Sequence, residues 1–184
     1  MAYSSKTMIV IALIIMIAIS PSLGRREKSD REKELRDLVS QTDESKESWK
    51  IIKPQLSRFT DTDPKIVADV ILDLAITRGD EIHEQLNRLH EDSRNDELKS
   101  KYLSCSKNYN DAIRNLKLAK RNLGSDDFHK IPIEIDDTIE ELNSCVLEFE
   151  GDSFDPAHIR NRQKEFGNYV NIVKVATDRL QDQN

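Results

Sequence analysis

The sequence predicts an all-α protein, an up-down-up-down four-helix bundle preceded by an N-terminal helical hairpin. Apolar residues recur at spacings of three and four along four long segments, and no stretch alternates apolar and polar residues as a half-buried strand would. Short polar turns join the four segments. Because short connections leave neighbouring helices no room to run parallel, we expect consecutive helices to pack antiparallel.

The first 24 residues are predicted to be a secretory signal peptide. Residues 8–19 (MIVIALIIMIAI) are all apolar, follow Lys6 and precede the small-residue segment 20–24. Such a run is too short to span a bilayer, and cleavage is expected after Gly24. Removing the signal leaves 160 of the 184 residues, with no membrane span expected; because Lys6 is the one charge lost, the net charge moves from −6 to −7.

Residues 25–184 are predicted to form one domain, with the hairpin over 25–60 and the bundle over 61–184. A chain of this length can bury a core, and its composition excludes a collagen, a disordered tail and a multi-pass membrane protein. The acidic balance argues against a nucleic-acid partner, because phosphate binding needs clustered Lys and Arg. It is compatible with a basic protein partner.

The hairpin is predicted as two helical segments. Residues 25–39 are dense in charge, which indicates a solvated helix or a frayed extension. Residues 44–59 carry one apolar stripe, which Pro54 interrupts. The members of that stripe are Trp49, Ile52, Leu56 and Phe59.

The first two bundle helices have the clearest patterns. The first is predicted from Asp63 to His90, opened by a capping aspartate and a proline, and Gly79 marks where it could bend. The second follows the polar break 91–95 and ends where Gly124 supplies a left-handed stop. Its apolar stripe comprises Leu98, Tyr102, Cys105, Tyr109, Ala112, Leu116, Ala119 and Leu123.

The last two bundle helices are also marked by their apolar positions. The third is predicted from the apolar positions between Ile135 and Phe149, and it ends at Gly151. The fourth is predicted to open at Pro156 and to run through Leu180.

Cys105 and Cys145 lie at or beside the apolar stripes of the second and third bundle helices. In an oxidising compartment such a pair is most simply a disulfide, worth about 4 kcal/mol in the chain-entropy model. The alternatives are two buried free thiols or a metal site. Zinc needs about four ligands in close spacing, and the nearest histidine in sequence is His129, so we expect no metal site.

No catalytic site is expected. His83-Glu84 begins like a zincin motif, but the residue four positions after the histidine is Asn87, and the four histidines are better explained as solvated helix residues. Neither a nucleophile elbow nor a phosphate-binding glycine loop occurs. A lipid carrier is disfavoured because one disulfide and an aromatic content of 5% indicate a filled bundle. Paired acids are better explained as outer helix faces than as catalytic carboxylates: Asp126-Asp127, Asp136-Asp137 and Glu140-Glu141.

Three segments resemble the plant invertase and pectin methylesterase inhibitors. Residues 105–112 (CSKNYNDA), followed by Leu116 and Ala119, are similar to the family's third-helix signature. Residues 142–149 (LNSCVLEF) resemble the family's next cysteine with its following aromatic, and residues 171–176 (NIVKVA) resemble a degraded C-terminal Asn-Ala-Leu-Ala segment.

The resemblance implies a protein secreted to the plant cell wall, or apoplast, that inhibits a carbohydrate-active enzyme by docking over its substrate cleft. It implies no catalytic residues and no cofactor, and it makes Cys105–Cys145 the family's second disulfide. Pectin methylesterase is the expected target. A cell-wall or vacuolar invertase is the alternative target, and a diverged, non-inhibitory secreted protein or ligand is a second alternative. An animal bundle hormone ranks lower, because it leaves the signature at 105–112 unexplained.

Two departures from the family bear on these expectations. Members usually carry another cysteine pair around a Thr in the hairpin, but Thr42 here has Val39 and Ser48 at the matching positions. The Pro-Lys-Phe stretch of the cell-wall invertase inhibitors is also replaced, which favours pectin methylesterase. Candidate partner contacts are the polar faces of the first two bundle helices and the loop residues Asp126, Asp127, Phe128, His129 and Lys130.

Overall fold

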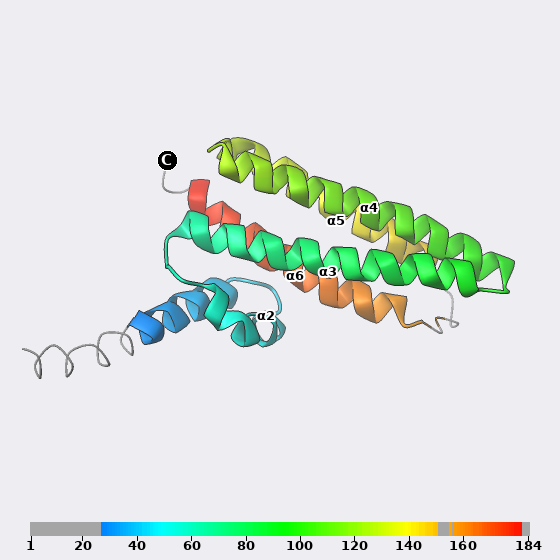
Figure 1. Ribbon diagram of the computed structural model, residues 1–184, viewed down its shortest axis with the longest axis horizontal. Helices are drawn as coiled ribbons and strands as arrows, with labels where there is room; N and C mark the ends of the chain where they lie inside the picture. The colour runs from blue at the N-terminus through cyan, green and yellow to red at the C-terminus, as the bar shows by residue number, and fades with distance from the viewer. Residues whose placement is uncertain (1–26, 151–154, 156, 182–184) are drawn as a thin grey trace, which may run out of the picture.

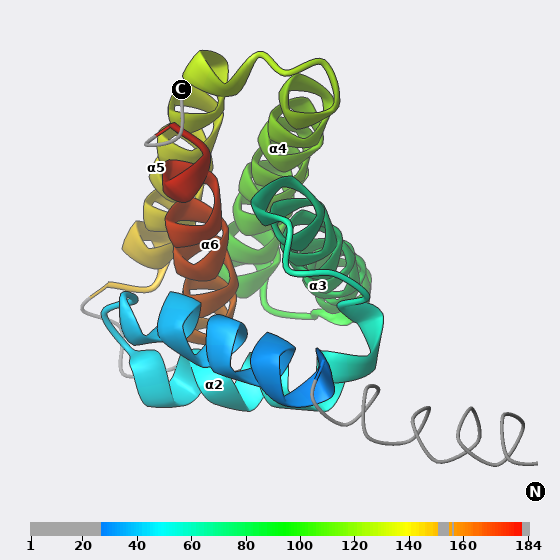
Figure 2. The same ribbon diagram turned by 90° about the vertical axis from the view of Figure 1, so that its left-hand side faces the viewer.

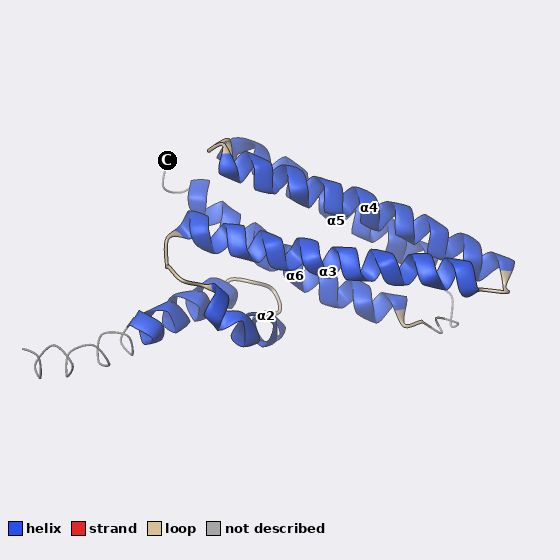
Figure 3. Cartoon of the chain, viewed as in Figure 1, coloured by secondary structure: helices blue, strands red, loops and turns tan. Residues whose placement is uncertain are grey.

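A computed structural model describes residues 27–150, 155 and 157–181 (Figure 1). The predicted signal peptide, 1–24, lies outside the described residues, as do the predicted helix end Gly151 and the predicted helix start Pro156. Helices account for most of what is described, and no strand occurs in that part of the chain (Figure 3). The predicted all-α bundle is confirmed.

Four long helices lie side by side along the long axis of the molecule (Figure 1). They are α3 (Pro64–Asp92), α4 (Asp96–Gly124), α5 (Ile131–Glu148) and α6 (Ile159–Gln181). Helix α3 packs against α4 and α6, and α5 packs against the same two helices from the other side. The predicted apolar stripe of α4 is buried throughout, from Leu98 to Leu123.

Local side-chain and backbone bonds set the helix ends. The carboxylate of Asp63 caps α3 by accepting from the backbone N–H of Lys65 (2.9 Å) and of Ile66 (3.1 Å). Asn95 caps α4 by accepting from Leu98 N–H at 3.0 Å. Helix α5 begins at Ile131, four residues before the first predicted apolar position, because the adjacent Pro132 suits a first turn.

The predicted left-handed stop at Gly124 is wrong. Gly124 is the last residue of α4, and the residue with positive φ is Asp126, at 61°. The N–H of Asp126 bonds to the Leu123 carbonyl and that of Asp127 to the Asn122 carbonyl, which is the bonding pattern of a Schellman motif. Aspartate tolerates the left-handed region better than most side chains, so the turn closes two residues later than the glycine indicates.

The hairpin lies across the bundle beneath α3 and α6 (Figure 2). It contains a helix over residues 27–40, then α2 (Ser45–Ile52) and the 3₁₀ helix η1 (Lys53–Arg58), which begins just before Pro54. Arg179 of α6 pairs with Glu34 (2.8 Å) and Asp37 (2.7 Å) of the first helix. That helix is therefore packed rather than frayed, and the buried apolar residues of the hairpin are Leu35, Leu38, Val39, Ile52 and Phe59.

Hydrogen bonds through Thr42 connect Val39 and Ser48, the two positions that match the other cysteine pair of the inhibitors the sequence resembles. Val39 and Ser48 are both buried, and Thr42 lies between them. Thr42 Oγ1 is 2.7 Å from the Val39 carbonyl oxygen and 2.8 Å from Ser48 Oγ. Because threonine has one hydroxyl proton, donation to the carbonyl leaves Thr42 to accept from Ser48. A buried hydrogen-bond chain thus joins the two positions without a covalent bond.

Gly79 and Gly167 make a matched pair for testing the packing. A Cβ at Gly79 would lie 2.9 Å from Ile113 Cγ1 and 3.0 Å from Phe166 Cζ, whereas a Cβ at Gly167 would meet nothing within 4 Å. We expect Gly79→Ala to lower the free energy of unfolding by about 1–3 kcal/mol through overpacking. Gly167→Ala should raise it by about 0.5–1 kcal/mol. Urea denaturation measures both, and equal effects would contradict this account of Gly79.

Removing the Thr42 hydroxyl should loosen the hairpin. Thr42→Val leaves the buried Ser48 hydroxyl without its partner, at a cost of about 1–3 kcal/mol. Hydrogen exchange should show faster exchange across the hairpin and unchanged protection in α4. Ser40→Ala is the matched control, because the Ser40 hydroxyl is exposed in the same turn; a comparable loss in that variant would argue against a special role for Thr42.

Candidate functional site

A disulfide holds α5 against α4. Cys105 and Cys145 are joined and fully buried, with their Cα atoms 4.7 Å apart. Nearby, Ser104 Oγ donates to Glu148 Oε1 at 2.6 Å, and the Tyr102 and Phe149 rings lie 6.0 Å apart. These contacts fix how the outer faces of the two helices lie next to each other.

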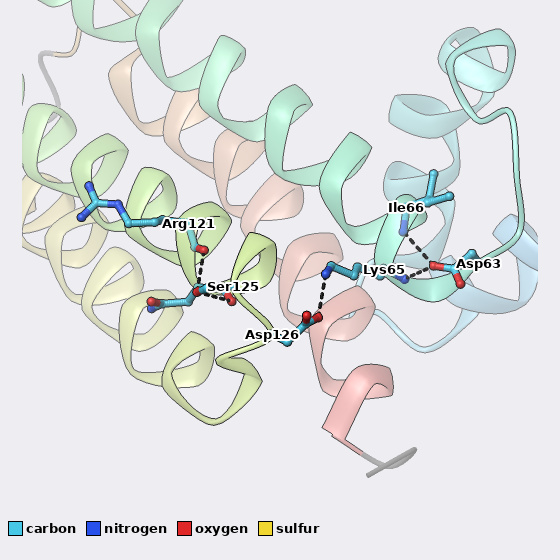
Figure 4. Close-up of polar contacts among 7 residues, drawn as sticks. Asp63, Lys65, Ile66, Arg121, Ser125 and Asp126 are labelled. Carbon is cyan, nitrogen blue, oxygen red and sulfur yellow. Dashed lines mark hydrogen bonds and ion pairs between the residues drawn. The ribbon is translucent and has the colours of Figure 1, made fainter.

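The five loop residues predicted to contact a partner lie together at one end of the bundle, between α4 and α5. Phe128–Lys130 form a short 3₁₀ helix, η2. Asp126 Oδ1 is 2.6 Å from Lys65 Nζ of α3 (Figure 4), and the Phe128 ring lies 5.9 Å from the same ammonium. Gln181 of α6 donates to the Phe128 carbonyl at 3.3 Å. The loop is therefore tied to α3 and α6, and it presents a preformed surface.

Asp127 and Lys130 add a charge pair to this loop. Lys130 Nζ lies 2.9 Å from Asp127 Oδ2, and its hydrogen bond and positive charge lower the pKa of the Asp127 carboxyl. His129 is exposed beside them. An exposed pair of this kind contributes little to folding, but it fixes where one positive and one negative group stand on the surface.

The polar face between α3 and α4 is largely neutralised by its own ion pairs. Lys120 Nζ lies 3.0 Å from Asp69 and 2.7 Å from Asp73, and Lys117 Nζ lies 3.5 Å from Asp80. Burial lowers the pKa of Lys120, but the two aspartates outweigh burial and the net shift is upward. Because its charges are already paired, this face offers a partner little unbalanced charge.

The outer face of α5 is different, because the helix has six acidic residues and no basic one. Within the described chain, no Lys or Arg pairs with any of the five acids between 134 and 141. Burial raises the pKa of Glu141, and the nearby carboxylates of Asp111, Asp137 and Glu140 raise it further, against the lowering effect of the Arg114 charge. We call these residues the acidic ridge: Asp111, Glu134, Asp137, Glu140 and Glu141.

Exposed apolar side chains stand at the two ends of the ridge. Ile133 is 62% exposed and Leu147 is 64% exposed, whereas most other large apolar residues that the structure describes are covered. Exposed apolar groups beside unpaired charge are typical of a protein-binding surface. The signal in the sequence that identifies the ridge is the net charge of each helix, because the same acids considered in adjacent pairs indicate only an outer helix face.

The described residues show neither a metal-binding group of three or more His, Cys, Asp or Glu nor a helix long and apolar enough to cross a membrane. The helix histidines have local partners instead. A ring nitrogen of His83 lies 3.3 Å from the Asn87 side chain, and His90 Nδ1 lies 3.0 Å from the Lys99 carbonyl.

Comparison with known proteins agrees with this architecture. The chain matches no protein-family model. It is 23% identical over 179 residues to a pectinesterase inhibitor of Actinidia deliciosa, covering 97% of this chain and 96% of that protein. A mutant pectin methylesterase inhibitor from Arabidopsis superposes with a TM-score of 0.70 at 19% identity, covering 79% of this chain and 95% of the other. A second pectin methylesterase inhibitor, from Arabidopsis thaliana, superposes with a TM-score of 0.61 at 20% identity, covering 80% of this chain and 96% of the other.

The predicted resemblance to this inhibitor family is confirmed. These relatives are named as inhibitors of an enzyme, which agrees with the prediction that the chain is not itself an enzyme. On this fold, the candidate recognition surfaces are the acidic ridge and the loop 126–130. The helices of the bundle hold both in place.

The two shifted carboxyl pKa values predict opposite pH effects on stability. The raised pKa of Glu141 means that the folded state binds its proton more tightly, so its contribution is most favourable at low pH and is lost as pH rises above about 4.5. The free energy of unfolding of Glu141→Gln, measured relative to that of the wild type, should therefore increase as the pH rises from 3.5 to 7. The free energy of unfolding of Asp127→Asn relative to the wild type should decrease over the same rise in pH. The lowered pKa of Asp127 means that its ionised carboxylate stabilises the wild-type fold at the higher pH. Urea denaturation at both pH values checks the two signs, and a shared sign would refute the assignment.

Proposed function

We propose that this chain is a secreted protein inhibitor of pectin methylesterase, which docks as a folded ligand over the enzyme's substrate cleft. The observation that carries the proposal is the similarity to a pectinesterase inhibitor over 97% of the chain, together with the bundle fold of two pectin methylesterase inhibitors. The predicted signal peptide supports secretion to the plant cell wall, and the disulfide suits an oxidising compartment.

The acidic ridge is the surface that best fits such docking. From Ile133 to Leu147, the ridge and its flanking apolar residues run along α5 for about 21 Å, at 1.5 Å per residue, which is the scale of a standard interface of about 800 Å² per partner. Asp111 is paired with Arg114, but the carboxylates of the four α5 residues, which form no ion pair with a described Lys or Arg, would attract a basic rim around the enzyme's cleft and speed encounter. Ile133 and Leu147 would supply apolar contacts at its two ends.

The paired charges between α3 and α4 make that face the weaker candidate. A partner charge approaching Lys120 or Asp73 would have to compete with an ion pair of 2.7 Å that already exists. We therefore place the docking face on α4 and α5, with the loop 126–130 at its edge. This moves the proposed contact from the first two bundle helices to the second and third.

An invertase is the second candidate target, and one residue favours it. Phe128 retains the aromatic of the Pro-Lys-Phe stretch that invertase inhibitors carry. Its ring lies against Lys65, and the side chain is partly buried, so it would have to leave that position to enter an active site. This cost makes pectin methylesterase the better candidate.

Charge reversal on the ridge should weaken inhibition. In a methanol-release assay with plant pectin methylesterase, Asp137→Lys with Glu140→Lys should raise the inhibition constant at least about ten-fold, since close interfacial charge pairs couple by 1.5 kcal/mol or more. Glu84→Lys is the matched control: its side chain is 71% exposed on α3, where it makes only a loose pair with Arg88 at 3.7 Å. It should change inhibition less than two-fold.

Three results would overturn parts of this proposal. Full esterase activity at micromolar concentrations of the protein between pH 5 and 7 would refute the target. Inhibition of an invertase in a parallel assay that Phe128→Ala abolishes would establish the second candidate. If neither enzyme is inhibited, the chain is a diverged secreted protein that no longer inhibits.

A further inference from the structure

A basic stripe on α4 runs beside the acidic ridge. It consists of Lys107, Arg114 and Arg121, which are exposed and follow one another at intervals of seven residues, so they lie on one face of the helix about 10 Å apart. Arg114 pairs with Asp111, and its charge acts on Glu141, which sets the two rows of charge next to each other. Among the described residues, no acid pairs with Lys107 or Arg121. One surface of the protein therefore carries a row of each sign.

Apolar side chains lie at both ends of this surface, and each helix contributes one at each end. Leu103 of α4 is 37% exposed and Leu147 of α5 is 64% exposed. At the other end, Ile133 of α5 is 62% exposed and Leu118 of α4 is half-buried. Most of the charges of the stripe and the ridge lie between these two apolar ends.

The contacts between α4 and α5 determine which groups are level with one another. Cys105 is bonded to Cys145, and Thr138 Oγ1 lies 3.5 Å from the Ala112 carbonyl oxygen, so the two helices are antiparallel in a defined register. In that register three pairs across the two helices are level: Leu103 with Leu147, Arg114 with Asp137, and Leu118 with Ile133. Apolar groups are therefore level at both ends, and opposite charges are level in the middle.

A two-fold rotation about an axis parallel to the helices makes this surface complementary to itself. The rotation lays α4 of one copy over α5 of the other at the same level, so each of the three level pairs forms twice between the copies. A two-fold axis across the helices would instead set the basic stripe against itself. A second copy satisfies both rows of charge at once, whereas a partner of one charge sign satisfies only one of them.

We propose that this chain forms a two-fold homodimer through the outer faces of α4 and α5. Helix α5 has 18 residues and is about 27 Å long, and two adjacent helices are about 20 Å wide, so the face has an outline of roughly 500 Å². This is below the roughly 800 Å² per partner of a standard interface, so the dimer is reversible and dissociates at micromolar concentrations.

The dimer does not rest on the proposed function, because it concerns the protein alone. It does cover the acidic ridge, so the two kinds of binding exclude each other. The consequence that the dimer does not inhibit rests on the proposed function. A dimer without esterase inhibition would refute only the proposed function, and inhibition by a chain that stays monomeric would refute only the dimer.

The test is sedimentation velocity of the protein purified from a secreting host. The net charge of −6 repels a second copy, but in about 0.15 M salt that repulsion is screened beyond about 8 Å, and the close pairs act across shorter distances. Between about 1 and 200 µM, the average mass should rise from that of one chain toward that of two. The mass of a single chain throughout this range would overturn the proposal.

Charge exchange between the copies locates the interface. Arg114→Asp and Asp137→Arg should each raise the dissociation constant at least about ten-fold, because each variant dimer contains two contacts between like charges. Mixing the two variants should restore dimers, since every such contact in the mixed dimer joins opposite charges. Glu84→Lys, on the exposed surface of α3, is the control and should dimerise like the wild type. Mixing that restores no dimer would refute the interface.

A second variant keeps the test decisive if Arg114→Asp disturbs the fold by leaving Asp111 without its partner. Leu147 is 64% exposed, so Leu147→Ser leaves the core intact. It should weaken the dimer about three-fold or more, because it removes an apolar contact that the symmetry forms twice. Circular dichroism checks that each variant is folded. A wild-type dissociation constant for both Leu147→Ser and Asp137→Arg would place the contact elsewhere and refute the proposal.

Discussion

The bond between Cys105 and Cys145 is the constraint on which both surfaces of α5 depend. It joins α4 to α5 inside the core and fixes the rotation of α5 about its own axis. One edge of α5 then meets Asp111 of α4 and forms the acidic ridge, while the other edge faces α6 across a surface groove that Ile139 of α5 and Gly167 of α6 line. A rotation of α5 by one residue, about 100°, would remove Glu141 from the ridge and Ile139 from the groove together.

Much of the bundle could be predicted from the sequence, because apolar periodicity reports which side of a helix is buried. The α4 stripe is buried from Leu98 to Leu123, and Asp63 caps α3 as expected. The wrong predictions concern helix ends, where one or two backbone hydrogen bonds determine which residue ends the helix. The α4 turn closes through Asp126 rather than at Gly124, since the bonds to Asn122 and Leu123 need the left-handed residue two positions later.

The sites were less predictable, because they depend on how helices lie against one another. The loop 126–130 could be found from its place between two helices, but not its attachment to Lys65 and Gln181, which come from distant segments. The groove could not be found at all. It exists only where α5 and α6 leave space over Gly167. The hairpin lacks the cysteine pair usual in the inhibitors that the sequence resembles. Thr42 and Ser48 instead form a buried hydrogen bond, which no sequence motif predicts.

The distribution of charge between helices explains why the ridge stays unneutralised. Helix α3 has seven acidic and three basic residues, α4 has three acidic and seven basic, and α5 has six acidic and none basic. The cations of α4 could neutralise either neighbour, but Lys117 and Lys120 point to α3 and pair with its aspartates. On the α5 side, Arg114 pairs with Asp111 of its own helix at 2.8 Å, and the α5 acids from Glu134 to Glu141 form no ion pair with a described Lys or Arg. The acidity of the ridge therefore follows from the rotation of α4, which directs these lysines to α3 and leaves the negative potential of α5 available to a partner.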